Sequence, residues 1–254
     1  MSALHRTASF VESAWHNEGA DFASNGERHV LEAFRPAGFR VALDVGANLG
    51  SWTKAALGLW PECMVHALEV APTTVEALTA AMAAHEHSNR IRLHPIGLSD
   101  REGEQTIYYY PDAPDLTSDV LRHEGKVRSV PIVARFSTLD RFCHDQGIGH
   151  VDYLKIDVEG AEHRVLKGGA GLLESGRIAC IQFEYGAFSI DSHFLLQDYF
   201  RLLERRFHIG KIYPTYVAFG LYDWRDEDFR FCNYLCIARD RPDLLRLVVG
   251  PDGA

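Results

Sequence analysis

The feature that most constrains the fold is the stretch 41–51, where a short apolar run meets a glycine-rich turn. Residues 41–44 are typical of a buried strand. Gly46, Asn48 and Gly50 follow, and the segment after them carries apolar residues at helical spacing. Such a turn brings backbone N–H groups close to a ligand, at the edge where the sheet of a doubly wound α/β fold opens. The stretch therefore predicts a Rossmann-like α/β fold with a ligand site at this edge.

An acid two residues before the first glycine narrows the class of ligand. The spacing is G-x-x-x-G rather than the G-x-G-x-x-G of dinucleotide-binding folds. The charge of Asp44 would repel a pyrophosphate, but it suits a ligand with an ammonium and a sulfonium, such as S-adenosylmethionine. An ordinary chain reversal would also use these glycines, so the turn alone leaves both interpretations open.

Composition and charge limit the classes of protein. The 254 residues, 46% hydrophobic and 24% charged, suffice for one large α/β domain, and the composition is typical of soluble globular proteins. The formal charge of −9 argues against nucleic acid as the main partner. No apolar run is long enough to span a membrane, and residues 1–10 lack the apolar centre of a signal peptide. We therefore expect a cytoplasmic protein without a membrane partner. Five scattered cysteines without a C-x-x-C pair indicate reduced, mostly buried thiols.

Three regions outside the core motifs complete the predicted organisation. Residues 1–40 are expected to form a helical cap that lies outside the sheet. Two strand-like segments within 104–134 flank an acidic loop, 111–125, and predict an inserted hairpin with a lid-like connection. The last two predicted strands, 208–219 and 231–239, form a terminal hairpin, whereas dinucleotide dehydrogenases normally end on a parallel strand.

Polar residues follow the second and third predicted strands. Glu69 comes 23 residues after Gly46, at a strand end where an acid can accept hydrogen bonds from a ribose diol. Ser99 and Asp100 come just after the third strand, where they could meet an adenine amino group or form a plain turn.

Three more acids fall at the ends of later strands. Asp157 ends one buried strand, Glu159 follows it two residues later, and Glu184 ends the next strand. Burying so many like charges around an empty cleft is unfavourable, so they imply cationic, metallic or hydrogen-bonding partners. They could act as general base for a hydroxyl or as ligands to a hard cation such as Mg²⁺. His163 is an alternative base, although we expect it on a helix surface.

Six motifs in order carry a family resemblance. They are LDVGANLG (43–50), GLSD with the following Gly103 (97–103), STLD (137–140), DYLKIDVEGAE (152–162), LKGG (166–169) and FE (183–184). In content and order they resemble the FkbM-type family of class I S-adenosylmethionine-dependent methyltransferases. The resemblance covers roughly residues 41–185, and the rest of the chain matches only in outline.

The resemblance implies a Rossmann-like methyltransferase domain over residues 41–254, with a mostly parallel seven-stranded sheet, an antiparallel C-terminal hairpin and helices on both faces. It implies S-adenosylmethionine as methyl donor and O-methylation of a hydroxyl on a sugar or natural-product intermediate. The cofactor-binding residues that it implies are Asp44, Gly46, Ala47, Asn48, Gly50, Glu69, Ser99 and Asp100. The expected catalytic residues, which are also the expected Mg²⁺ ligands, are Asp157, Glu159 and Glu184.

Other functions stay open at this point. They are methylation of a nitrogen or a phenol, nicotinamide-dependent oxidoreduction on the same fold, and a non-catalytic Rossmann-like module. The missing G-x-G-x-x-G and the terminal hairpin argue against the oxidoreductase, and the acids along the rim argue against the module. The sequence does not identify the methyl acceptor, and it leaves a homo-oligomer open.

Overall fold

The computed structural model describes residues 3–113, 117–118 and 128–249. The helices are α1 (Ala3–His16), α2 (Glu27–Ala33), α3 (Ser51–Leu59), α4 (Pro72–Ala83), α5 (Leu139–Asp145), α6 (Glu162–Gly168), α7 (Ala170–Glu174), α8 (Phe188–Ser192), α9 (Leu196–Leu203) and α10 (Pro242–Val248). The strands are β1 (Val41–Val45), β2 (Met64–Leu68), β3 (Ile91–His94), β4 (Gly97–Leu98), β5 (Gly103–Tyr109), β6 (Val130–Ser137), β7 (Val151–Ile156), β8 (Ile178–Tyr185), β9 (Phe207–Tyr213), β10 (Tyr216–Gly220) and β11 (Cys232–Ala238). None of the helices in these ranges combines the length and apolar character needed to cross a bilayer.

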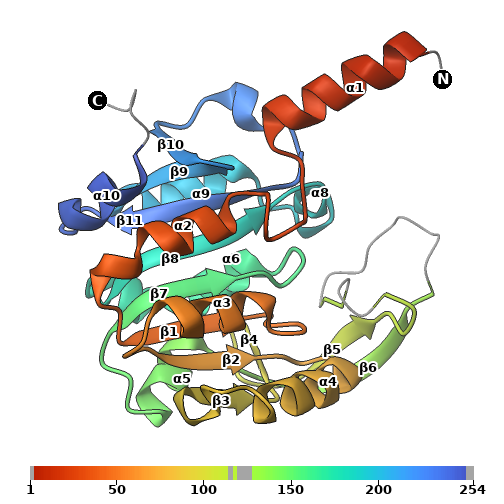
Figure 1. Cartoon of the computed structure of the whole chain (residues 1–254). Coiled ribbons are helices and arrows are strands. Elements are labelled where there is room, and N and C mark those ends of the chain that lie inside the picture. The colour runs from red at the N-terminus through yellow and green to blue at the C-terminus, as the bar shows by residue number, and fades with distance from the viewer. Residues whose placement is uncertain (1–2, 114–116, 119–127, 250–254) are drawn as a thin grey trace.

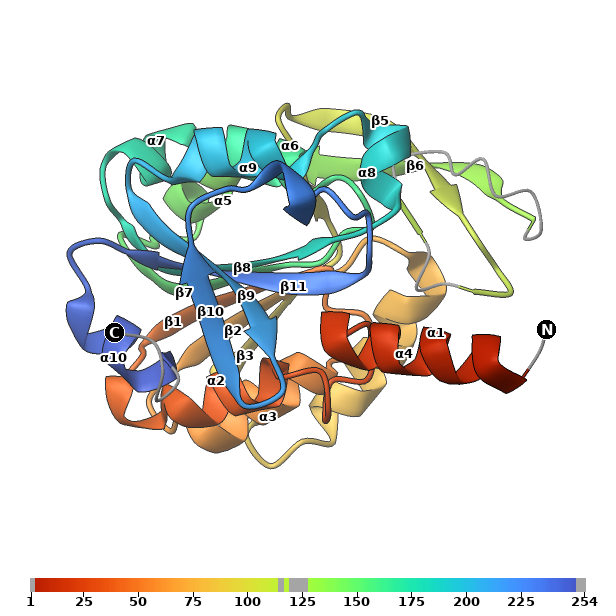
Figure 2. The ribbon, with the colours of Figure 1, turned by 90° about the horizontal axis from the view of Figure 1, so that it is seen from above.

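The central sheet has the order β10-β9-β11-β8-β7-β1-β2-β3 and is covered by helices on both faces (Figures 1 and 2). Strands β3, β2, β1, β7 and β8 are parallel, whereas β11 runs antiparallel to both of its neighbours. The expected class I α/β architecture with antiparallel C-terminal strands is confirmed.

The sheet has eight strands rather than the seven expected. The segment 208–219, expected to be one strand with a continuation, turns back at Pro214 and forms the antiparallel pair β9–β10, with Tyr213 opposite Tyr216. Proline suits this turn because its fixed φ favours chain reversal and it has no N–H to donate to a ladder.

The two faces of the sheet bury separate apolar cores. Along β7, Leu154 and Ile156 face the core under α5, α6 and α9, while Tyr153 faces the core under α2 and α3. The same alternation places Asp44 of β1 and Lys155 of β7 on the α2–α3 face. Charged side chains therefore approach the carboxyl edge of the sheet from one face.

The N-terminal segment packs on one face of the sheet through buried side chains of α2. The Glu27 carboxylate is buried, and it accepts hydrogen bonds from Asn25 Nδ2 at 2.8 Å and from Gln182 Nε2 of β8 at 2.6 Å. Gln182 in turn accepts a hydrogen bond from the Tyr153 hydroxyl at 2.7 Å. Helix α2 thus packs on the sheet face, whereas α1 extends from the body (Figure 1). The described residues 3–40 contribute helices and no strand to the two sheets.

The inserted segment forms a second sheet beside the first. Strands β5 and β6 pair antiparallel, and β4 adds a parallel third strand. The second strand of the inserted hairpin, β6, begins at Val130. Most of the loop 111–125 lies outside the described residues, so its lid-like role stays a prediction.

Candidate functional site

A cavity of about 240 Å³ lies at the carboxyl edge of β1, β2, β7 and β8. Ile107 of β5 and Phe136 of β6 form its side walls, together with Ala20 after α1 and Phe231 just before β11. Its lining includes Gly46, Asn48, Glu69, Asp157, Glu159 and Glu184. The structure thus brings six of the expected site residues to one cavity, from four separate parts of the chain.

The glycine turn is fixed by close contacts with its neighbours. The N–H groups of Gly46 and Ala47 both donate to the Leu68 carbonyl, at 3.0 and 2.9 Å. Gly46 has φ +81°, and a Cβ at this position would lie 1.8 Å from the backbone oxygen of Asp157. Only glycine fits here, because the turn lies directly against the end of β7.

Glu69 ties the end of β2 to the turn. Its carboxylate accepts hydrogen bonds from the N–H groups of Asn48 at 2.9 Å and of Val70 and Ala71 at 2.8 Å each. Burial raises the pKa of Glu69, although these three bonds oppose the shift. A carboxylate offers about four acceptor sites, so capacity remains for a ligand hydroxyl in the cavity.

Asp44 lies beneath the turn rather than in the cavity. The side chain is fully buried, and Oδ2 accepts a hydrogen bond from the Thr53 hydroxyl at 2.6 Å. Its Oδ1 lies 3.4 Å from the Lys155 ammonium. Asp44 thus supports the turn from below, and its expected role toward a cofactor stays a prediction. Ala47 and Gly50 are likewise absent from the lining, because they face the α3–α4 side.

The cavity wall that follows β3 is formed by other residues than Ser99 and Asp100. Ser99 is buried and donates to the Asp100 carboxylate at 3.3 Å, while Asp100 is exposed, and neither lines the cavity. Gly97 lines it together with Phe136 of β6 and Ile107 of β5. A Cβ on Gly97 would lie 2.2 Å from the Phe136 ring, so this glycine lets the ring reach the wall. No signal in the sequence indicated the two apolar residues.

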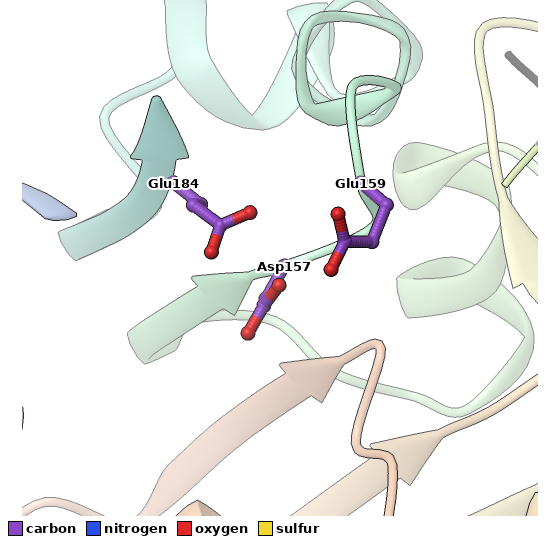
Figure 3. A group of neighbouring side chains, drawn as sticks. All are labelled: Asp157, Glu159 and Glu184. Carbon is purple, nitrogen blue, oxygen red and sulfur yellow. The ribbon is translucent and has the colours of Figure 1, made fainter. Parts of the chain in front are cut away.

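Three carboxylates meet at the other end of the cavity, and Figure 3 shows Asp157, Glu159 and Glu184 facing one another. One oxygen from each lies within 4.8 Å of the others. Glu184 is only 4% exposed, and its Oε2 has no hydrogen-bond partner among the described residues. The Lys155 ammonium lies 3.0 Å from Asp157 Oδ2. We call Asp157, Glu159 and Glu184 the acid cluster.

The acid cluster is electrostatically unbalanced. Burial raises the pKa of Glu184 well above its usual range, and the charges of Asp157 and Glu159 raise it further. The nearby Lys155 charge only partly opposes the shift. The cluster will therefore take up protons or a cation, because a buried and unpaired carboxylate is costly.

Glu162 fixes the turn that carries Glu159. Its fully buried carboxylate accepts hydrogen bonds from the N–H groups of Val158 at 2.9 Å and Gly160 at 3.0 Å. Glu159 has φ +60°, a conformation that costs free energy in a residue other than glycine. Glu162 thus holds the strained turn in place.

Glu162 should also make stability depend on pH. Burial raises its pKa from 4.5 to about 7, so its contribution to stability is present below pH 4.5 and is lost as the pH rises through about 7. From pH 4.5 to about 8, we expect the free energy of unfolding of the wild type to fall by roughly 3 kcal/mol more than that of Glu162→Gln. Denaturant unfolding of both proteins across this range is the measurement, and equal slopes would refute the assignment.

His163 is neither a surface residue nor part of the cavity. The side chain is 6% exposed, and its ring stacks on Phe194 with centroids 4.6 Å apart. Burial lowers the pKa of His163 to about 4. The expected surface position is wrong because α6 turns this face inward, and a role as the site's base is not supported.

Comparison with known proteins adds sequence evidence. The family model described as the methyltransferase FkbM domain matches residues 44–208. The chain is 28% identical over 152 residues to methyltransferase sdnD of Sordaria araneosa, covering 50% of this chain and 59% of the relative. It is 32% identical over 167 residues to the 31-O-demethyl-FK506 methyltransferase FkbM of Streptomyces tacrolimicus (56% and 62% covered). It is 27% identical over 157 residues to the 2-O-methyltransferase NoeI of Sinorhizobium fredii (56% and 63% covered). The matches span about three-fifths of each relative.

Among solved structures, a methyltransferase FkbM from Methylobacillus flagellatus KT superposes with a TM-score of 0.50 at 16% identity. The superposition covers 82% of this chain and 47% of that one. At this identity the likeness concerns the fold alone.

Proposed function

Because the chain belongs to the FkbM methyltransferase family, as the match over residues 44–208 shows, we propose that it transfers a methyl group from S-adenosylmethionine to a hydroxyl of a small molecule. A sugar or a natural-product intermediate is the proposed class of acceptor. Two of the relatives are named as O-methyltransferases, which supports oxygen over nitrogen as the methylated atom. The observation that carries the proposal is the acid-lined cavity against the glycine turn.

The residues present fit this cofactor. Four acids line the cavity, and no Lys, Arg or His is among the described lining residues, so a positively charged ligand is favoured. When bound, S-adenosylmethionine supplies an electrophilic methyl group on a sulfonium. Asn48 and Glu69 would hold its ribose end, and Phe136 would cover a flat ring beside Gly97.

The acid cluster would accept the proton of the acceptor hydroxyl. A sugar hydroxyl is a poor nucleophile at neutral pH, so removal of its proton as the methyl group transfers lowers the barrier. Asp157 is the first candidate for the base, since it lines the cavity and Lys155 orients its carboxylate. Burial raises the pKa of Glu184, so its carboxylate, where ionised, accepts a proton more readily than an exposed glutamate does.

The same cluster fits a hard divalent cation. Carboxylate oxygens are the ligands that Mg²⁺ prefers, and among the described residues no donor reaches the buried Oε2 of Glu184. Asp157, Glu159 and Glu184 would hold the ion, which when bound would polarise the acceptor hydroxyl.

The cofactor assignment can be tested by calorimetric titration with S-adenosylmethionine and its demethylated product. Replacing Glu69 with alanine should weaken binding by about 100-fold, because it removes the acceptor for a ribose diol and three bonds that hold the turn. The matched control is Glu76→Ala, an exposed glutamate on α4, which should bind like the wild type.

Titrations of the wild type and of Glu69→Ala, together with a titration of the wild type with a nicotinamide dinucleotide, separate the alternatives. Absence of binding by the wild type would contradict the methyltransferase proposal, and binding of a nicotinamide dinucleotide instead would favour the oxidoreductase. Equal affinities of wild type and Glu69→Ala would remove Glu69 from the cofactor site.

A further inference from the structure

Lys155 is a buried cation in the middle of the site. The residue is 6% exposed and extends along the α2–α3 face of β7. Its ammonium lies 3.0 Å from Asp157 Oδ2 and 3.4 Å from Asp44 Oδ1. One side chain therefore contacts both the acid beneath the glycine turn and the first acid of the cluster.

The contacts of Asp44 continue this connection into helix α3. The Thr53 hydroxyl donates to Asp44 Oδ2 at 2.6 Å, and Thr53 lies in the first turns of the helix that follows the glycine turn. The connected side chains are Thr53, Asp44, Lys155 and Asp157. They run from α3 through β1 and β7 to the acid cluster, all on one face of the sheet.

The backbone of the turn crosses directly above these side chains. The Asp157 N–H donates to the Val45 carbonyl at 2.9 Å, and Gly46 is in van der Waals contact with the Asp157 backbone. The glycine turn and Asp157 are therefore in direct backbone contact. Without Lys155, Asp44 would be a buried and unpaired charge at the base of that turn.

We propose that Lys155 is a positioning residue that locks the glycine turn and the acid cluster into one unit, by neutralising Asp44 beneath the turn and holding Asp157 beside it. This connection between the glycine turn and the acid cluster does not depend on any ligand. Its effect on the cofactor rests on the proposed function.

Hydrogen exchange measured by mass spectrometry tests the lock without any ligand. In Lys155→Met, amides in peptides covering 44–50 and 156–160 should exchange at least tenfold faster than in the wild type, because both segments lose their common partner. Peptides of helix α9 should be unchanged, which distinguishes local release from general loss of stability. Exchange within twofold of the wild type in both segments would overturn the proposal.

Two further variants control for charge and for folding. Lys54→Met removes an exposed lysine beside the same turn, and it should leave exchange within twofold of the wild type. The double variant Asp44→Asn/Lys155→Met leaves no buried charge at Asp44, so it should fold even where the single variant does not. We expect it to restore protection in 44–50 but not in 156–160. If the double variant showed wild-type protection in both segments, the link between Lys155 and Asp157 would be refuted.

Titration with S-adenosylmethionine adds a functional readout. At a temperature where circular dichroism shows Lys155→Met to be folded, we expect at least a tenfold loss of affinity. A folded variant with wild-type affinity would refute the effect on the cofactor. If the wild type itself does not bind, the proposed function fails, while the exchange comparison still decides the role of Lys155.

Discussion

Replacing Asp157 with asparagine is expected to lower the rate of methyl transfer by about 1,000-fold, while the affinity for S-adenosylmethionine stays within about threefold of the wild type. Asparagine keeps the shape of the side chain and can still accept a hydrogen bond from Lys155. It cannot take a proton from the acceptor or offer a charged ligand to a cation. Release of the demethylated cofactor with a panel of hydroxylated acceptors measures the rate.

The matched control for this prediction is Asp240→Asn, an exposed aspartate just after β11, which should turn over like the wild type. Addition of a chelator separates the two roles of the acid cluster. If a carboxylate acts alone as the base, the chelator should leave the wild-type rate unchanged. If Mg²⁺ is required, the chelator should lower that rate. Turnover retained by Asp157→Asn would remove this residue from the mechanism.

The second large effect is expected at Gly46. In Gly46→Ala, the added methyl group would lie 1.8 Å from the backbone oxygen of Asp157, at a φ of +81° that alanine rarely adopts. Either β7 or the turn must move, so we expect the free energy of unfolding to fall by at least about 3 kcal/mol. Denaturant unfolding is the measurement.

Gly58→Ala is the matched control for Gly46→Ala. Gly58 lies within α3, no atom lies within 4 Å of a Cβ built there, and alanine favours the helix by up to about 1 kcal/mol. The control should therefore be as stable as the wild type or more so. A loss below about 1 kcal/mol in Gly46→Ala would show that the turn yields easily and does not depend on this glycine.

The parts of the site that sequence spacing could reveal are those at strand ends. Gly46, Asn48 and Glu69 were identifiable because a turn after one parallel strand and an acid after the next share one edge of the sheet. The three residues of the acid cluster follow the same rule. The parallel strands β3, β2, β1, β7 and β8 agree with the mostly parallel sheet that the family resemblance implied.

Spacing in the sequence does not encode side-chain direction or the partners of a side chain. Asp44 is a strand residue on the α3 face, and only the folded structure shows Lys155 and Thr53 beside it. His163 has a spacing compatible with a helix surface, yet Phe194 from a later segment covers it. Phe136 reaches the cavity through the register of an inserted hairpin, which the sequence pattern leaves undetermined.

The buried Glu184, whose Oε2 has no hydrogen-bond partner among the described residues, makes the proposed site a local compromise between stability and activity. A hydrophobic residue of similar size at this buried position would remove a desolvation cost from the empty protein. Substitutions that raise the melting temperature are therefore expected to arise in the acid cluster itself, and each would lower activity. A screen that ranks variants of this protein by thermal stability alone would therefore select against the proposed catalytic residues.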